Sequence, residues 1–221
     1  MNARQRAQEA VAATSRRLAQ EGLLIGTAGN VSLRYPGPTG DEVAITATGV
    51  TLADAEPGQV SILALDGSQL EGEFAATSEA GLHLDALRER GGAVVHTHSP
   101  VATAISLVVD ELPCVHYQQL MLGGSVRVAP FEVFGSPELA RAVHDALDGK
   151  MAAILANHGT VALGVDLRQA AENALLLEWA ATLYWRARSI GEPRVLSADQ
   201  QAAVIQAAVA SGYGTPKRVQ S

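Results

Sequence analysis

The chain has 221 residues, of which 48% are hydrophobic and 18% charged, as expected for one compact globular domain. A net charge of −7 without any basic run argues against a nucleic-acid partner. The apolar stretches are too short to span a membrane, residues 1–22 lack the apolar segment of a signal peptide, and the single cysteine, Cys114, has no intramolecular disulfide partner. We therefore expect a soluble cytoplasmic protein.

Hydrophobic periodicity predicts helices and strands in an irregular order. We expect a first helix over residues 2–21, and then a strand, a glycine-rich turn and a second strand within residues 23–35. Short strands follow at 42–47 and 60–65. A helix over 78–91 comes next, with Ser78 as its N-cap and Glu79 as its first helical residue.

A buried strand at 93–98 ends at Ser99-Pro100, where another helix begins. Further strands are predicted at 125–130 and 151–159, and further helices at 136–148, 166–190 and 197–211, before the tail 212–221. Because strands and helices do not alternate strictly, this order favours a single-domain, layered α/β sandwich around a mixed sheet over a (β/α)8 barrel.

Two histidines on the strand at 93–98 are the sharpest chemical signal. On a strand, His96 and His98 would share one face with their Cα atoms about 6.6 Å apart, so both imidazoles could bind one cation. His158 follows another apolar strand. Three imidazoles leave coordination positions open, which is the catalytic rather than the structural pattern. Taken alone, a pair such as His96 and His98 is more often two unrelated histidines, and a single residue such as His158 is more often an ordinary core histidine.

Glu79 has two interpretations. A carboxylate at a helix N-terminus is stabilised by the helix dipole, which is a purely structural role. The functional alternative is a general acid/base or a displaceable metal ligand. His83, one turn further on, would lie on the same helix face and support the site or pack in the core. His144 is predicted on a helix surface.

Three turns of small residues, at 26–32, 47–50 and 77–79, could bind a phosphate through backbone N–H groups and hydroxyls. None matches a P-loop or a dinucleotide-binding fingerprint. The only two lysines, Lys150 and Lys217, lie outside apolar runs. Schiff-base catalysis needs a lysine whose pKa is lowered by burial. Such a lysine is therefore not expected.

In order, the segments GTAGNVSLRY, ITATG, TSE, AVVHTHSP, VHY with GG after it, AP with FG after it, and NHG resemble the class II aldolase/adducin family. The similarity is greatest to the branch that acts on L-fuculose 1-phosphate. It implies an α/β/α sandwich with a mixed, largely antiparallel central sheet. It also implies a Zn2+ site, with Mn2+ or Co2+ equally compatible with the same donors. The implied ligands are His96, His98, His158 and, in the resting site, Glu79.

The resemblance further implies how the substrate is held. Glu79 would become the acid/base once substrate displaces it, and Tyr117 would be a proton donor from a neighbouring subunit of a homotetramer. Phe134 and Tyr213 would wall the aldehyde end, and the tail 212–221 would close over the active site. The implied phosphate-binding residues are Gly29, Asn30, Thr48, Gly49, Thr77 and Ser78.

The implied reaction is reversible cleavage of a ketose 1-phosphate to dihydroxyacetone phosphate and an aldehyde. L-Lactaldehyde is the default, but enzymes that cleave 5-deoxyribulose or methylthioribulose phosphates use the same residues, and Gln118–Leu122 departs from the family pattern. Dehydratases and decarboxylases of sugar phosphates stay open as alternatives. Epimerases of ribulose 5-phosphate tend to carry Asp in place of Glu79, and adducin-like non-catalytic modules lack the three histidines.

Overall fold

The computed structural model describes residues 1–38 and 40–213. A nine-stranded sheet with the order β4-β3-β2-β1-β5-β9-β8-β7-β6 runs through them. Neighbouring strands are antiparallel except β7 and β8, so the predicted mixed, largely antiparallel sheet is confirmed. The strands are β1 (Asn30–Gly37), β2 (Gly40–Thr46), β3 (Val60–Ala64), β4 (Gln69–Glu71), β5 (Ala93–Thr97), β6 (Glu111–Leu112), β7 (Val126–Ala129), β8 (Ala152–Leu155) and β9 (Gly159–Gly164).

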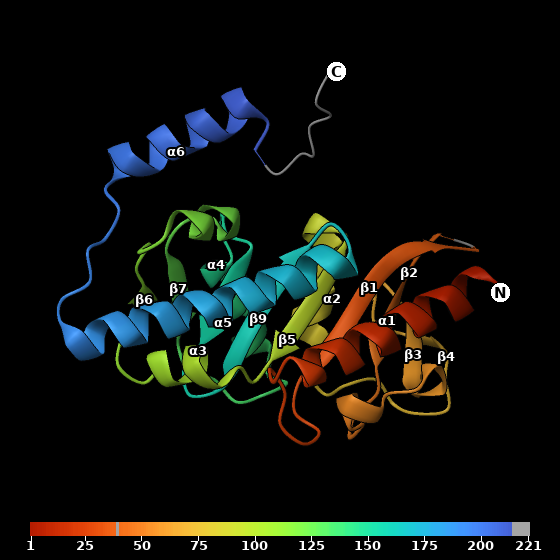
Figure 1. The fold of residues 1–221 in the computed structure, drawn as a ribbon. Helices are drawn as coiled ribbons and strands as arrows, with labels where there is room; N and C mark the ends of the chain where they lie inside the picture. Colours follow the sequence, from red (N-terminus) through yellow and green to blue (C-terminus); the bar gives the residue numbers. More distant parts are fainter. Residues whose placement is uncertain (39, 214–221) are drawn as a thin grey trace.

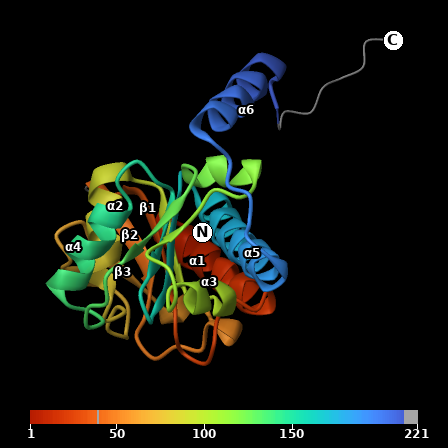
Figure 2. The same cartoon turned by 90° about the vertical axis from the view of Figure 1, so that its left-hand side faces the viewer.

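Helices cover both faces of the sheet, which confirms the predicted α/β/α sandwich (Figure 2). One face carries α1 (Ala3–Gln20), α3 (Pro100–Ile105) and α5 (Leu167–Ile190), and the other carries α2 (Ala80–Arg90) and α4 (Pro137–Ala146). The last helix, α6 (Ala198–Ser211), stands off the sandwich (Figure 1). Three short 3-10 helices complete the chain: η1 (Leu52–Asp54), η2 (Pro57–Gln59) and η3 (Tyr117–Leu122). Within the described ranges, no helix combines the length and the hydropathy that a membrane crossing requires.

Alternation along the central strands divides the interior into two apolar layers, because successive side chains point to opposite faces. On β5, Val95 packs in the layer under α1 and α5, whereas Val94 packs in the layer under α2 and α4. The antiparallel register places Asn30 opposite His96. The polar ends of β1 and β5 therefore meet on the face that α2 and α4 cover.

Some expected elements differ in the structure. Residues 23–25 form no strand, because both edges of β1 are already paired, with β2 and β5. The chain turns there instead, and Gly29 has a φ of 95° where a Cβ would collide with Leu24. The strand expected at 151–159 ends at Leu155, and β9 begins at Gly159.

The start of α2 also differs from the expectation. Ser78 does not cap this helix: the N-cap residue is Glu79, and its side chain makes no capping hydrogen bond. The reason is that the Glu79 carboxylate is turned away toward Asn30 and two histidines. A residue expected within the helix is therefore the residue that precedes it, with its side chain free for other contacts.

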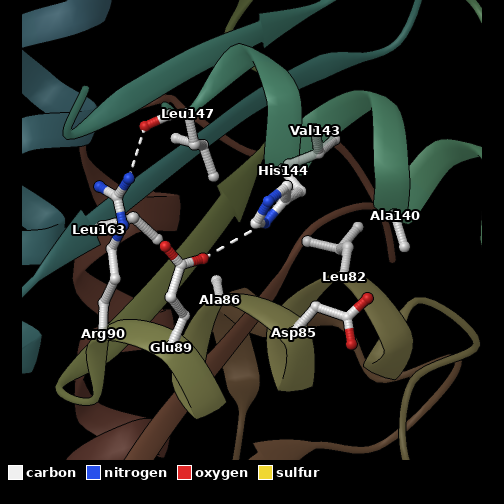
Figure 3. A pocket seen from close by; sticks show the side chains of 10 residues that line it. All are labelled: Leu82, Asp85, Ala86, Glu89, Arg90, Ala140, Val143, His144, Leu147 and Leu163. Carbon is white, nitrogen blue, oxygen red and sulfur yellow. Dashed lines mark hydrogen bonds and ion pairs between the residues drawn. The ribbon is translucent and has the colours of Figure 1, made fainter. Parts of the chain in front are cut away.

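Helices α2 and α4 pack directly against each other (Figure 3). Arg90 donates to the carbonyl oxygens of Leu147 and Lys150, and His144 lies 3.3 Å from the carboxylate of Glu89. The cavity between these helices has a volume of about 10 Å³, room for a single water molecule. His144 is half-exposed on the helix surface, as predicted, and its ring contacts the carboxylate of Glu89.

Candidate active site

Three histidines converge at one end of the sheet. His96 is on β5, His98 follows one residue after that strand, and His158 lies in the turn between β8 and β9. Their ring centroids are 4.9 to 5.0 Å apart, and one nitrogen of each lies within 4.8 Å of the others. The antiparallel pairing of β5 with β9, with Thr97 opposite Thr160, brings the distant segments together.

The ring of His96 is oriented by the backbone. Its Nδ1–H donates to the carbonyl oxygen of Thr160 at 2.9 Å, which turns Nε2 toward the centre of the cluster. There Nε2 lies 3.2 Å from Nε2 of His98 and 3.3 Å from Oε2 of Glu79. The hydroxyls of Thr97 and Thr160 are 2.8 Å apart and tie the two strands together directly behind the histidines.

The two carboxylate oxygens of Glu79 have different surroundings. Oε2 accepts a hydrogen bond of 2.9 Å from the side-chain nitrogen of Asn30. Oε1 lies 3.4 Å from Nε2 of His158, and it is buried without a hydrogen-bond partner among the described residues. A buried carboxylate oxygen without a donor is rare in folded proteins, so its position calls for a ligand.

These four side chains fit a divalent cation. Imidazole nitrogens and a carboxylate oxygen are the donors that zinc, manganese and cobalt accept. The unpartnered Oε1 of Glu79 supplies a fourth donor beside the three ring nitrogens. A bound cation would compete with protons for these donors, so metal affinity should rise with pH.

The protonation states favour binding at neutral pH. Burial by itself would raise the pKa of Glu79, but the hydrogen bonds and charges of His96, Asn30 and His158 outweigh it and hold this pKa well below the usual range. Burial, together with the neighbouring histidines, lowers the pKa of His98 to about 4. Burial likewise lowers the pKa of His158. Burial therefore favours neutral rings for His98 and His158 beside the carboxylate of Glu79, and these are the protonation states that metal binding requires.

Behind Glu79 lies a buried polar chain that sequence patterns indicated only in part. His83, fully buried on α2, is within 2.7 Å of Ser32 Oγ through Nδ1 and contacts Asn30 Oδ1 through Nε2. Burial lowers the pKa of His83 to about 3, so its ring is neutral. Asn30 also donates to Thr77 at 3.1 Å.

A cavity of about 740 Å³ opens beside the histidines. Glu79, His98 and His158 form part of its wall, and Phe134 lies at its exposed rim. No lysine or arginine of residues 1–38 and 40–213 lines it. The structure brings all six residues expected around the phosphate into its wall: Gly29, Asn30, Thr48, Gly49, Thr77 and Ser78.

The remaining expected residues lie elsewhere. Tyr117, on η3, and Tyr213, after α6, do not line the cavity; their hydroxyls are 3.1 Å apart. They border a separate apolar groove of about 500 Å³ between η3 and α6. In one chain, therefore, these two tyrosines are apart from the histidines.

Four lining residues were missed from the sequence: Phe131, Glu132, Val133 and Asn157. Asn157 has a φ of 57°, a left-handed conformation that asparagine tolerates and that fits a strand-ending turn before His158. Its position in Asn-His-Gly could have indicated it. Glu132 also lines the cavity, and nothing in its sequence context marks it.

Comparison with known proteins agrees with this geometry. Residues 9–185 match the family described as Class II Aldolase and Adducin N-terminal domain. Over 89% of its length the chain is 38% identical to 92% of the 5-deoxy-D-ribulose 1-phosphate aldolase of Bacillus thuringiensis serovar kurstaki. It is 35% identical to the L-fuculose phosphate aldolase of Escherichia coli K12, over 83% of this chain and 85% of that one. It superposes on a solved L-fuculose 1-phosphate aldolase with a TM-score of 0.85 and 28% identity, covering 91% and 95% of the two chains.

A mixed-sheet sandwich with a histidine cluster at one end of its central strands and a carboxylate beside it is the arrangement expected of a metal-dependent enzyme of the class II aldolase type. The chain belongs to the class II aldolase and adducin family. Its relatives are named aldolases, so it is an aldehyde-lyase of the class II family.

Proposed function

We propose that this chain reversibly cleaves a ketose 1-phosphate between C3 and C4, giving dihydroxyacetone phosphate and a short deoxy aldehyde. The observation that carries the proposal is the shared cavity. Its wall combines Glu79 and the histidine cluster with turns of small residues that can hold a phosphate. A substrate bound by its phosphate at those turns would extend its carbonyl carbon toward the histidines.

The phosphate end would be bound without any cation from the residues described. Gly29 and Gly49 have φ values of 95° and 74°, and their backbones can approach a ligand closely because no side chain intervenes. The hydroxyls of Thr48, Thr77 and Ser78 complete a set of neutral donors. Such oriented N–H and O–H groups can hold a phosphate dianion.

A divalent cation, which we propose to be zinc, would be held by His96, His98 and His158 and would supply Lewis-acid polarisation of the substrate carbonyl at C2. The Glu79 carboxylate then moves the proton at C3. It returns a proton to C3 after the bond to C4 breaks, and it removes that proton in the reverse direction. The unpartnered Oε1 is the atom that we assign to this transfer.

Tyr117 is proposed to take the proton of the C4 hydroxyl during cleavage. Since Tyr117 does not line its own cavity, it would act in that of a neighbouring copy, within a homotetramer. The apolar groove between η3 and α6, and the absence of any buried residue on α6, support such an assembly. Phe134 and Tyr213 are proposed to bound the aldehyde end. Residues 214–221, expected to close over the site, lie outside the described residues.

The charge of the cavity favours a neutral aldehyde end. Among the described residues its charged lining groups are Glu79 and Glu132, and no arginine or lysine offsets these two carboxylates. A substrate with a carboxylate in addition to its phosphate would face Glu132 in this chain. We therefore favour 5-deoxy-D-ribulose 1-phosphate or L-fuculose 1-phosphate over an acidic sugar phosphate.

The test is a substrate comparison with the zinc-loaded protein. We expect dihydroxyacetone phosphate to form from the two deoxy ketose 1-phosphates, measured through the NADH consumed by glycerol-3-phosphate dehydrogenase. A 3-oxo-tetronate 4-phosphate, methylthioribulose 1-phosphate and ribulose 5-phosphate would be run in parallel. Loss of CO2, loss of water or epimerisation, without dihydroxyacetone phosphate from either deoxy substrate, would contradict the proposal.

A further inference from the structure

A buried hydrogen-bond chain leads from β1 through α2 to the carboxylate of Glu79. Ser32 and His83 are both fully buried, and neither lines the substrate cavity. Ser32 Oγ lies 2.7 Å from His83 Nδ1, and His83 Nε2 contacts Asn30 Oδ1. Asn30 in turn donates to Glu79 Oε2 at 2.9 Å. Four side chains therefore form one line that ends on the proposed acid/base.

The direction of every bond in this line follows from donor and acceptor accounting. The Glu79 carboxylate can only accept, so the nitrogen of the Asn30 amide must face it. The oxygen of that amide then faces His83 Nε2, which must carry the ring proton. In a neutral ring Nδ1 is left as an acceptor, and the hydroxyl of Ser32 is its donor.

Without these partners the Asn30 side chain would have two nearly equivalent orientations, because its oxygen and nitrogen are similar in size. The reversed amide would place its oxygen opposite Glu79 Oε2, where two acceptors would repel each other. It would also require His83 to carry its ring proton on Nδ1, with Ser32 accepting. Packing distinguishes the two orientations poorly, whereas the Glu79 carboxylate, which can only accept, admits only one, and His83 and Ser32 hold the amide in it from behind.

We propose that Ser32 and His83 are positioning residues: they hold the Asn30 amide with its nitrogen toward Glu79, and so hold that carboxylate between His96 and His158. This inference rests on the proposed role of Glu79 in moving the C3 proton. It assigns to Asn30 a second role, in addition to its proposed place among the residues that bind the phosphate. One amide then links the phosphate end of the cavity to the acid/base.

The first test reads the ring of His83 directly and needs no activity. In protein labelled with ¹⁵N-histidine, we expect NMR to show His83 with Nε2 protonated and Nδ1 unprotonated. The signal is assigned by its loss in His83→Gln, or by its shift in Ser32→Ala if the first variant does not fold. A His83 ring protonated at Nδ1 would reverse the line of donors and overturn the proposal.

The second test is kinetic and compares two buried serines. Ser32→Ala removes the donor at the start of the line, and Ser15→Ala removes a fully buried hydroxyl that only donates to Val11 within α1. The assay is deuterium exchange at C3 of dihydroxyacetone phosphate in deuterated water, with bound zinc measured in each protein. We expect Ser32→Ala to lower the maximal exchange rate about tenfold, with the KM unchanged, and Ser15→Ala to keep the wild-type rate.

A conservative pair sharpens the result. His83→Gln keeps an N–H that can reach Asn30, so it should retain more exchange activity than His83→Leu. Equal rates for Ser32→Ala and wild type at equal zinc content would contradict the proposal. If the wild type itself shows no exchange, the proposed function fails. The hydrogen-bond arrangement around Asn30 is then tested only by the NMR measurement of which His83 nitrogen carries the proton.

Discussion

At the scale of single residues, the two carboxylate oxygens of Glu79 differ in their contacts. One carboxylate oxygen is held by Asn30, and the other is buried beside His158 without a donor. A residue used only as a helix cap would direct its oxygens at backbone N–H groups, which Glu79 does not do. The side chain is thus held for a task at the histidine cluster.

Glu79→Gln should abolish proton transfer while leaving the three histidines in place. We expect the C3 exchange of dihydroxyacetone phosphate to fall at least about 100-fold, since a general acid/base contributes roughly 10²–10⁴ in rate. Bound zinc, measured by mass spectrometry, should stay near the wild-type content. Glu89→Gln, on the outer part of the same helix, is the matched control and should exchange normally. A Glu79→Gln protein with more than a tenth of the wild-type rate would remove Glu79 from this role.

The three clustered histidines were predictable as candidates at this scale, and the lining residues only in part. His96 and His98 share a strand spacing and His158 follows a buried strand, but it was the family resemblance that grouped them as one site. The expectation for Tyr117 involves a neighbouring copy, so the geometry of one chain does not test it. Glu132 was missed because its role depends on a fold-level contact that no local spacing encodes.

At the scale of elements, β5 and β9 determine the geometry of the cluster. Gly159 begins β9, and a Cβ at this position would collide with the carbonyl of Thr97 and crowd His96. The backbone of Thr97 cannot move aside for a Cβ as a flexible side chain could. The close approach of the two strands that carry His96 and His158 therefore requires glycine.

Gly159→Ala should separate β5 from β9 and loosen the cluster. We expect zinc affinity to fall at least about tenfold and the protein to be destabilised by about 2 kcal/mol, within the range of overpacked cores. Gly81→Ala, at an open helical position on α2, is the control and should stabilise by about 0.5–1 kcal/mol. Isothermal titration of zinc and urea unfolding measure the two quantities. Wild-type zinc affinity in Gly159→Ala would show that the strands tolerate the added methyl group.

A second prediction concerns how α1 is fixed to the sheet. Arg4 on α1 donates two hydrogen bonds to the buried Glu42 on β2, at 2.9 and 2.8 Å, and Tyr35 donates a third at 2.9 Å. The Arg4 bond is the largest influence that lowers the pKa of Glu42, against burial, which raises it. A carboxyl whose folded pKa is lowered stabilises fully above its unfolded value of about 4.3 and loses that contribution as the pH falls.

We therefore expect wild type to be more stable than Glu42→Gln at pH 6 by about 2 kcal/mol, the cost of breaking a buried charged hydrogen bond. That difference should shrink as the pH falls below about 4.3. Urea unfolding of both proteins across pH 3–7 measures it, with the exposed Glu73→Gln as control. A difference that stays constant with pH would mean that the Glu42 carboxylate does not titrate with folding.

Most elements could be predicted, and the exceptions have physical reasons. The helices at 136–148, 166–190 and 197–211 carry long stretches of helix-forming residues, and each was found within a few residues of its expected bounds. The strand β9 was missed because glycine stands at both of its ends, and β6 because it has only two residues. Residues 23–25 have strand-like composition, but no free strand edge is available to them.

At the scale of the whole molecule, the exposed α6 and the two tyrosines require an explanation beyond one chain. Figure 1 shows α6 standing off the sandwich above η3, and none of its residues is buried. Its apolar side chains Val204, Ile205 and Val209 face the groove that Tyr117 also lines. We propose that a second copy covers this surface and receives Tyr117 in its cavity.

Subunit mixing tests that proposal. Glu79→Gln and Tyr117→Phe should each be poor in carbon–carbon cleavage, but dissociated and reassembled together they should regain part of the activity. A hybrid assembly would contain sites in which both residues are intact. The mass of the assembly would be followed by light scattering, and separately refolded variants are the control. No gain above the sum of the two variants would place Tyr117 in its own cavity or outside catalysis.

The most direct measurement of the central claim is proton exchange at C3 of dihydroxyacetone phosphate, followed by ¹H NMR in deuterated water. It requires the cation site and Glu79 but no knowledge of the aldehyde. The account predicts stereospecific loss of one C3 hydrogen signal with zinc-loaded protein. It predicts none after chelation and none with Glu79→Gln. A zinc-loaded wild-type protein that leaves both C3 hydrogens in place would contradict the aldolase mechanism proposed here.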